Sequence, residues 1–215
     1  MLTVHHLGIS QSDRIVWLCE ELAIHYKLIR YTRDPETNFA PKEYKALHPF
    51  GTAPVITDGD VVLGESGAII EYIIGKYGNG RLSVSADKPN FADYLYWFHF
   101  ANGSLMASSM VDMAVNGLGG AGDNQHIRRL CARSDLAFDM IDKRLSTAKY
   151  FAGEEFTAAD IIMLFPLTTM RVFLKRDISG YPHLVAYLQR ISKRAAYRHA
   201  MELADPDLDL TPLLN

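Results

Sequence analysis

The hydrophobic pattern of the chain changes near residue 80, and this change limits the possible folds more than any other feature. Before it, short alternating or β-branched apolar runs predict strands, and apolar residues at helical spacing predict helices between them. The strand candidates lie at residues 2–7, 26–31, 55–57 and 61–63. Beyond residue 88 only helical spacing remains. The sequence therefore predicts an α/β domain over residues 1–80 and an all-α domain over residues 88–215.

Composition and charge narrow the classes of protein to which the chain can belong. Hydrophobic residues make up 48% of the 215 residues and the net charge is −3, which fits folded domains and argues against nucleic acid or an anionic membrane as a partner. There is no apolar run of about 18 residues and no signal peptide before the first predicted strand, so we expect a cytoplasmic protein. Cys19 and Cys131 form no C-x-x-C pair, and we expect no bound metal.

Two short segments predict where a ligand binds. In Thr52-Ala53-Pro54-Val55-Ile56 a turn enters a strand through a proline, and Glu65-Ser66 precedes the apolar helix predicted over residues 67–77. The N-terminus of a helix carries unpaired N–H groups and partial positive charge, which favour a carboxylate. Glu65 beside it can receive an ammonium group. A site that accepts both groups fits the α-amino-acid end of a small peptide.

Another local signal concerns folding rather than binding. The segment Phe156-Thr157-Ala158-Ala159-Asp160-Ile161 matches a capping box, in which Thr157 caps a helix and the side chain of Asp160 reaches back to it. Phe156 and Ile161 stand where a hydrophobic staple would form. Each half of such a cap is worth about 1 kcal/mol, so we expect these residues to stabilise the helical domain.

Together these segments resemble the cytosolic glutathione transferase family over nearly the whole chain. Ala53-Pro54-Val55 resembles the cis-proline loop of its thioredoxin-like domain, and Glu65-Ser66 resembles its γ-glutamyl site. The capping box and Tyr181-Pro182-His183-Leu184 resemble the starts of two of its C-terminal helices. Residues 4–22 and 97–105 resemble a bacterial and fungal branch of serine type. The resemblance implies the glutathione transferase fold, with a thioredoxin-like N-terminal domain and an all-helical C-terminal domain.

The resemblance also implies how reduced glutathione would bind to the first domain. Thr52, Ala53 and Pro54 would present the turn to the cysteinyl unit, where the backbone of Ala53 makes the contact. Glu65 and Ser66 would hold the γ-glutamyl end. The alternative for Pro54 is an ordinary trans proline that opens an edge strand.

A hydroxyl near the first helix is the group that the resemblance implies for activating the thiol of glutathione. A bound thiolate is the competent nucleophile, whereas a free thiol is mostly protonated near neutral pH. Ser10 takes the family's serine position relative to Arg14, and Ser12 is the next choice. Arg14 is the candidate for added positive charge. The alternative role for Ser10 is helix capping, since Ser10-x-x-Asp13 is itself a capping box.

Two histidines adjoin this loop on the first predicted strand. Successive side chains of a strand point to opposite faces, so we expect one of His5 and His6 to face inward and the other outward. Packing in the core or exposure on the surface is the ordinary role of each.

The acceptor pocket is expected on the first helix of the second domain, which is predicted to run from Phe91 with Leu105 and Ser109 on one continuing face. This helix offers aromatic and sulfur-containing side chains that suit a hydrophobic electrophile: Tyr94, Trp97, Phe98, Met106 and Met110. An aromatic stripe at helical spacing is also typical of a core, so core packing is the alternative at each position.

The predicted function is a glutathione S-transferase that conjugates the thiolate of reduced glutathione to small hydrophobic electrophiles, a detoxification reaction. The same thiolate would serve a peroxidase acting on organic hydroperoxides. Glutathione is a co-substrate, and no permanently bound cofactor is expected. The alternatives share the fold: a non-catalytic glutathione- or ligand-binding protein, or a glutathione-dependent isomerase or dehalogenase. The resemblance implies a homodimer in which the first domain of one subunit contacts the second domain of the other.

Overall fold

The computed structural model describes residues 1–174 and 176–214, which divide into two compact units. Unit 1 comprises Met1–Ser83 together with Ser192–Asp209, and unit 2 comprises Val84–Ile191 together with the segment that begins at Leu210. The chain passes from one unit to the other inside the interval 80–88 where the hydrophobic pattern changes. The return of residues 192–209 to unit 1 was not expected, because nothing in their pattern distinguishes them from the preceding helices.

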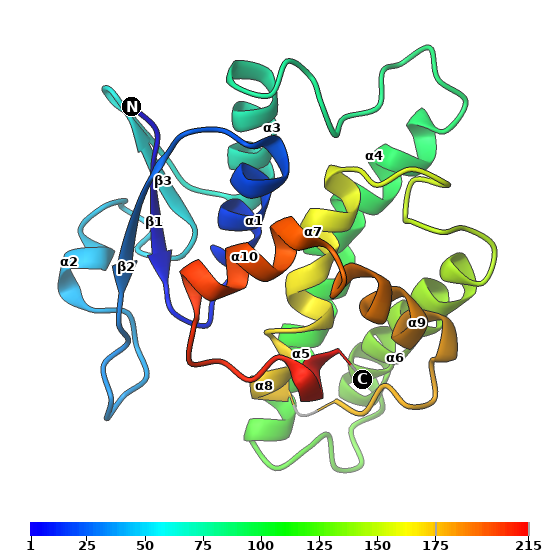
Figure 1. The fold of residues 1–215 in the computed structure, drawn as a ribbon. Helices are drawn as coiled ribbons and strands as arrows, with labels where there is room; N and C mark the ends of the chain where they lie inside the picture. Colours follow the sequence, from blue (N-terminus) through cyan, green and yellow to red (C-terminus); the bar gives the residue numbers. More distant parts are fainter. Residues whose placement is uncertain (175, 215) are drawn as a thin grey trace. The chain divides into compact units, whose positions relative to one another are not determined.

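Unit 1 is built on a four-stranded sheet. Its strands are β1 (Thr3–Leu7), β2 (Lys27–Tyr31), β3 (Val55–Asp58) and β4 (Val61–Leu63). They lie in the order β2-β1-β3-β4, with β2 parallel to β1 and β3 antiparallel to both β1 and β4 (Figure 1). Gly59 in the turn between β3 and β4 has φ 60°, which a glycine adopts without steric cost. The predicted hairpin is therefore confirmed.

Helices cover both faces of this sheet. They are α1 (Asp13–Leu22), the short α2 (Lys42–Lys45), α3 (Ser66–Lys76) and α10 (Ala195–Ala204). Figure 1 shows α1 and α3 on one side of the sheet and α2 on the other. α10 packs along α1, where the Trp17 and Tyr197 rings meet edge to face with 5.2 Å between centroids. Arg194 adds an ion pair with Glu21, with 2.7 Å between Nε and Oε1. These contacts join the late helix to unit 1.

Among its described residues, unit 2 has helices as its regular secondary structure, apart from an isolated β-bridge between Tyr150 and Gly153. Its helices are α4 (Phe91–Phe100), the π-helix η1 (Ala101–Met106), α5 (Ala107–Gly117), α6 (Gln125–Leu145), α7 (Ala158–Leu167), α8 (Arg171–Leu174), α9 (Pro182–Ile191) and the 3-10 turn η2 (Thr211–Leu213). All ten residues of α7 are buried, as expected for a helix that is apolar on every side. Within the described part of the chain, no helix has the length and hydropathy needed to cross a membrane.

The capping box at the start of α7 is confirmed. The Thr157 N–H donates to Asp160 Oδ2 at 2.9 Å, and the Ala159 N–H donates to Thr157 Oγ1 at 3.3 Å. The other oxygen of Asp160 accepts from the Phe151 N–H at 3.0 Å and from the Tyr187 hydroxyl at 3.2 Å. Burial raises the pKa of Asp160 to about 6, although these hydrogen bonds oppose the shift. The carboxyl group thus holds together three segments of unit 2.

The first helix of unit 2 differs from the prediction of one regular face. The six residues of η1 form a π-helix between α4 and α5, and the wider turn shifts the side chains that follow it. Leu105 and Ser109 are nevertheless both fully buried. The helical spacing identified which residues enter the core, but it did not indicate the change of helix type.

Candidate functional site

The proline turn lies directly before β3. The Ala53–Pro54 peptide bond is cis, so the trans alternative is wrong, and Val55 then enters the sheet beside β1. Pro54 is buried, Ala53 is half-buried and Thr52 is exposed. Ala53 packs against a core cluster that includes Tyr44 of α2. The turn therefore has a fixed base in unit 1 and an open edge at Thr52.

Glu65 and Ser66 mark the start of α3. Glu65 is exposed and has φ 66°, which is uncommon for a residue other than glycine and costs on the order of 1–3 kcal/mol. Ser66 is buried, and its hydroxyl accepts a hydrogen bond from Arg14 Nη1 at 3.0 Å and donates to Gln11 Oε1 at 3.5 Å. The first N–H groups of α3 and the guanidinium group of Arg14 place positive charge at the same point.

Arg14 is almost completely buried, with 1% of its surface exposed. Burial lowers its pKa to about 10, and the neighbouring Asp13 carboxylate opposes this shift, so the side chain stays cationic near neutral pH. The sequence associated Arg14 with Ser10 and Ser12, whereas the structure brings it to Ser66. Its charge therefore supports the helix N-terminus at which a carboxylate is expected.

Ser10 and Ser12 lie in residues 8–12, the loop between β1 and α1, and both are buried. Ser10 Oγ donates to the Leu7 carbonyl at 2.6 Å and lies 2.7 Å from Ser12 Oγ. Ser12 Oγ accepts from the Leu7 N–H at 3.1 Å and lies 2.9 Å from His6 Nδ1. Ser10 is not the N-cap of a capping box with Asp13, because α1 begins at Asp13 and its N-cap is Ser12. The Ser10 hydroxyl accepts from the Ser12 N–H at 3.3 Å and donates to the end of β1. The two candidate hydroxyls instead form one hydrogen-bonded pair.

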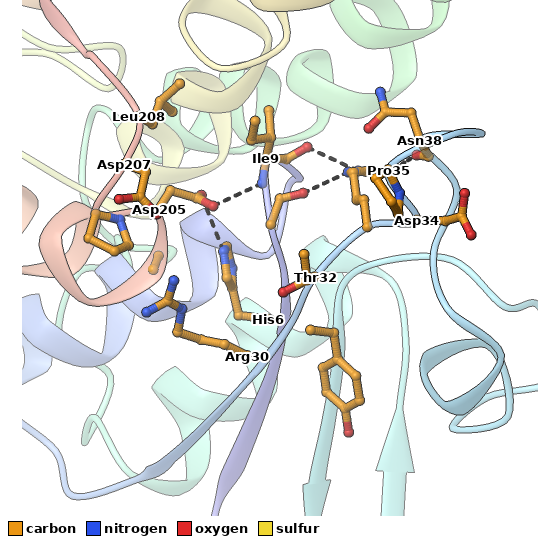
Figure 2. Close-up of a pocket in the computed structure, with 15 residues that line it drawn as sticks. His6, Ile9, Arg30, Thr32, Asp34, Pro35, Asn38, Asp205, Asp207 and Leu208 are labelled. Atoms are coloured by element: carbon orange, nitrogen blue, oxygen red, sulfur yellow. Dashed lines mark hydrogen bonds and ion pairs between the residues drawn. The ribbon is translucent and has the colours of Figure 1, made fainter.

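Both histidines of β1 are buried, so the expectation that one faces outward is wrong. His5 lies between two hydroxyls, with Nδ1 3.0 Å from Tyr31 and Nε2 3.1 Å from Thr57, and burial lowers its pKa. His6 points to the other face, where Nε2 is 3.2 Å from Asp205 Oδ2 (Figure 2). Each face of β1 is covered by other parts of unit 1, and this leaves neither ring in solvent.

Unit 1 contains a cavity of about 390 Å³ beside this loop (Figure 2). It is bounded by the β1–α1 loop, the segment after β2 and the segment after α10. Arg33 crosses between two of these segments: Nε donates to the Gly8 carbonyl at 2.7 Å, Nη2 to the Ile9 carbonyl at 3.0 Å and Nη1 to the Asn38 carbonyl at 3.0 Å. Arg33 thus fixes the loop that carries Ser10.

Sequence reasoning missed three residues that contact the predicted site: Gln11, Arg33 and Asp205. Asp205 follows the last residue of α10, and it reaches β1 only because that helix returns to unit 1. One weak signal could have found it. An acidic residue at the C-terminus of a helix is disfavoured by the helix dipole, which suggests a partner elsewhere in the chain.

The predicted acceptor residues lie in unit 2 and differ in exposure. Three are buried aromatic side chains: Tyr94, Trp97 and Phe98. Trp97 packs against Phe151 with 5.3 Å between ring centroids, which is the contact of a core residue. Met106 is half-buried in η1, and Met110 of α5 is 48% exposed. The two methionines are therefore the members of the set with surface to offer a ligand.

The chain's own thiols and metal-binding side chains are possible sources of other chemistry. Cys19 is buried and Cys131 is half-buried, and both are free thiols. Burial raises the pKa of each, so neither is a thiolate near neutral pH. Among residues 1–174 and 176–214, no three His, Cys, Asp or Glu side chains gather closely enough to hold a metal ion.

Comparison with known proteins relates both units to one family. Residues 10–74 match the family model of the glutathione S-transferase N-terminal domain, and residues 122–195 match that of the C-terminal domain. The chain is 35% identical to glutathione S-transferase 3 of Schizosaccharomyces pombe, over 94% of this chain and 87% of that protein. It is 27% identical to glutathione S-transferase 1 of Saccharomyces cerevisiae, over 95% of each. A crystal structure of a glutathione S-transferase from Actinobacillus pleuropneumoniae is 33% identical and has a TM-score of 0.88, over 100% of this chain and 99% of that one.

Proposed function

Because the chain belongs to the glutathione S-transferase family, we propose that it binds reduced glutathione in unit 1 and transfers the thiolate to small hydrophobic electrophiles. The observation that carries this proposal is the arrangement at the start of α3. There Glu65 is exposed, and the buried hydroxyl of Ser66 is paired with the buried cation of Arg14. One point of unit 1 thus offers both a carboxylate and positive charge, which is the complement of an α-amino acid.

In this proposal the two ends of the γ-glutamyl group are recognised separately. Its carboxylate accepts hydrogen bonds from the first N–H groups of α3 and from Ser66, and Arg14 adds charge through Ser66. Its ammonium group pairs with Glu65. The cysteinyl unit lies along Thr52, Ala53 and Pro54, where the backbone of the turn has its open edge.

The proposed chemistry is stabilisation of a thiolate followed by nucleophilic attack. The Ser10 hydroxyl turns from the Leu7 carbonyl to donate to the sulfur, and Ser12 supports it. With an organic halide, a sulfur–carbon bond forms, the carbon–halogen bond breaks, halide leaves, and the thiol proton has already passed to solvent. Positioning and thiolate stabilisation supply the rate enhancement. For the electrophile we propose contacts with Met106 and Met110.

Replacement of the proposed hydroxyl tests this function. With an activated aryl chloride as the electrophile, Ser10→Ala is expected to lower kcat about 10²-fold, the loss typical of one hydrogen-bond donor to a developing or stabilised anion. Binding of glutathione should change little. Ser83→Ala, which removes an exposed serine of the same unit, is the matched control and should match the wild type. Equal rates for Ser10→Ala and the wild type would remove Ser10 from the mechanism.

A second candidate function, a glutathione-binding protein without turnover, is favoured by one observation. The Ser10 hydroxyl hydrogen is already given to the Leu7 carbonyl at 2.6 Å. If that bond persisted with glutathione bound, the thiol would lack its donor. Binding of glutathione by a wild-type protein that turns over neither aryl chlorides nor organic hydroperoxides would support this candidate.

We further propose that the protein is a cytoplasmic homodimer. Unit 2 exposes apolar side chains around a hollow of about 430 Å³ between α5 and α6, among them Val111, Leu130 and Leu136. An exposed apolar patch of this kind is typical of an interface. The proposed contacts join the first domain of one subunit to the second domain of the other. Sedimentation equilibrium at micromolar concentration should give the mass of two chains, and a monomeric mass would contradict the proposal.

A further inference from the structure

The loop at residues 8–12 is held in an unusual backbone conformation. Ile9 has φ 49°, in the left-handed region that a β-branched residue rarely adopts. Such a conformation persists only where surrounding contacts enforce it. Arg33 donates to the carbonyls of Gly8 and Ile9. The Ile9 N–H donates to Asp205 Oδ1 at 3.0 Å (Figure 2). The loop that carries Ser10 is thus held by hydrogen bonds to two distant residues, Arg33 and Asp205.

The second carboxylate oxygen of Asp205 reaches the same loop by another route. Oδ2 lies 3.2 Å from Nε2 of His6, and the two side chains are only 8% and 1% exposed. On the other side of the ring, Nδ1 lies 2.9 Å from Ser12 Oγ, which in turn lies 2.7 Å from Ser10 Oγ. One buried carboxylate therefore connects, through a histidine and a serine, to the hydroxyl proposed to hold the thiolate.

The number of available hydrogens fixes which atom donates and which accepts in this series of contacts. The contacts from His6 to Ser12, from Ser12 to Ser10 and from Ser10 to the Leu7 carbonyl need one hydrogen each, and the two hydroxyls supply two. The third is present when His6 carries a hydrogen on Nδ1. On the other side of the ring, Asp205 Oδ2 lies 3.2 Å from Nε2, within ion-pair distance. Each hydroxyl then donates to the next acceptor in the series, and each also accepts from a backbone N–H, that of Leu7 at Ser12 Oγ and that of Ser12 at Ser10 Oγ. Donation along such a series strengthens the last donor.

Four other charged side chains line the cavity beside this pair. Arg30 stands opposite His6 in the register of β1 and β2, and Arg33 interacts electrostatically with Asp205. Asp34 and Asp207 also line the cavity, and both are exposed. Asp205 is the carboxylate in contact with the His6 ring, so a change at this residue acts on the chain of hydrogen bonds directly.

We propose that Asp205 is a positioning residue for thiol activation: through His6 and Ser12 it orients the Ser10 hydroxyl as a hydrogen-bond donor to the sulfur of glutathione. The inference rests on the proposed function, since it requires glutathione with its sulfur at Ser10. The Ser10 hydrogen that now goes to the Leu7 carbonyl would go to the thiolate, and no covalent bond to Asp205 forms or breaks.

The test is the ionisation of bound glutathione in Asp205→Asn, followed by the ultraviolet absorbance of the thiolate as a function of pH. Asparagine keeps an oxygen for the Ile9 N–H but removes the charge beside His6. We expect the apparent pKa of the bound thiol to rise by about one unit, with kcat/KM about tenfold lower at neutral pH and recovering at high pH. Ser12→Ala should do the same, and the double variant should lose no more than either single variant. Asp207→Asn, in the next exposed turn, should match the wild type.

Other results would overturn either the inference or the proposed function on which it rests. If Asp205→Asn lowers the unfolding temperature but leaves the pKa of the bound thiol at the wild-type value, Asp205 only stabilises the fold, and the inference is overturned. If the wild type itself forms no thiolate, the proposed function fails first. Should the variant not fold, nitrogen-15 NMR of wild-type His6 decides: a hydrogen on Nδ1 in the glutathione complex supports the inference, and its absence overturns it.

Discussion

Asp160 of unit 2 and Asp205 of unit 1 both have largely buried carboxylates, which are held in different ways. Asp160 of unit 2 accepts hydrogen bonds from Phe151, Thr157 and Tyr187, all of which belong to unit 2. Asp205 of unit 1 accepts from the backbone of a strained loop and pairs with His6. A carboxylate saturated by the surrounding framework stabilises a fold. A carboxylate whose partners lead to a candidate hydroxyl is placed to influence chemistry. Mutation of Asp160 should therefore change mainly stability, and mutation of Asp205 should change mainly thiol activation.

The largest expected effect is on stability at Asp160. Asp160→Ala should lower the free energy of unfolding by about 3–5 kcal/mol, because each buried donor that loses its acceptor costs about 1–3 kcal/mol. Denaturant unfolding followed by circular dichroism measures the change. Asp60→Asn in the exposed turn between β3 and β4 should stay within about 0.5 kcal/mol of the wild type. A loss below 1 kcal/mol at Asp160 would place it with ordinary surface positions and remove the contrast with Asp205.

The pH dependence of stability sharpens the same contrast. Burial raises the pKa of Asp160 to about 6 from its ordinary value of 3.8, so the folded state binds this proton more tightly than the unfolded state. The resulting stabilisation is complete below pH 3.8 and is lost as the pH rises through about 6, a change on the order of 2–3 kcal/mol. Unfolding free energies of the wild type relative to Asp160→Asn should therefore fall between pH 4 and 7. Parallel curves for the two proteins would contradict the shift.

Within unit 1, a change at Ser66 should affect glutathione binding without affecting activation of the thiol. Ser66→Ala should raise the Kd for glutathione about tenfold, a loss of about 1.4 kcal/mol, because the carboxylate loses a donor and Arg14 loses its acceptor. The pKa of the bound thiol should stay at the wild-type value. Titration calorimetry gives the first quantity and thiolate absorbance the second. A shift in thiol pKa without a change in Kd would mean that Ser66 and Ser10 have exchanged the roles proposed for them.

The smallest expected effect is at the acceptor surface. Met110→Ala should raise KM for a hydrophobic electrophile by about two- to threefold and leave KM for glutathione unchanged, since a partly exposed side chain loses little apolar contact. Leu118→Ala, at an 88% exposed leucine after α5, is the matched control. Steady-state kinetics with both substrates varied provides the measurement. Identical behaviour of the two variants would remove Met110 from the pocket.

Local patterns were sufficient for much of the fold. The capping box at Thr157 and Asp160 and the hairpin around Gly59 were predicted because each depends on residues within about ten positions of one another. The cis bond before Pro54 came only from the family resemblance, since its local sequence also fits a trans proline.

The contacts that organise the site join residues that are far apart in the sequence. Arg14 meets Ser66 across 52 residues, and Ile9 meets Asp205 across 196. No spacing in the sequence encodes such pairs, because the first depends on how α1 packs against α3 and the second on the return of α10 to unit 1. The same limit applies to His6: its alternation with His5 was correct, but the cover on both faces of β1 comes from distant segments.

The central claim is that unit 1 both binds reduced glutathione and ionises its thiol. It is tested most directly by calorimetric titration of glutathione into the wild-type protein in two buffers of different ionisation enthalpy, since the difference in heat reports protons released on binding. We predict saturable binding with release of a proton near neutral pH. Binding without proton release would contradict thiol activation, and no binding at millimolar glutathione would contradict the site itself.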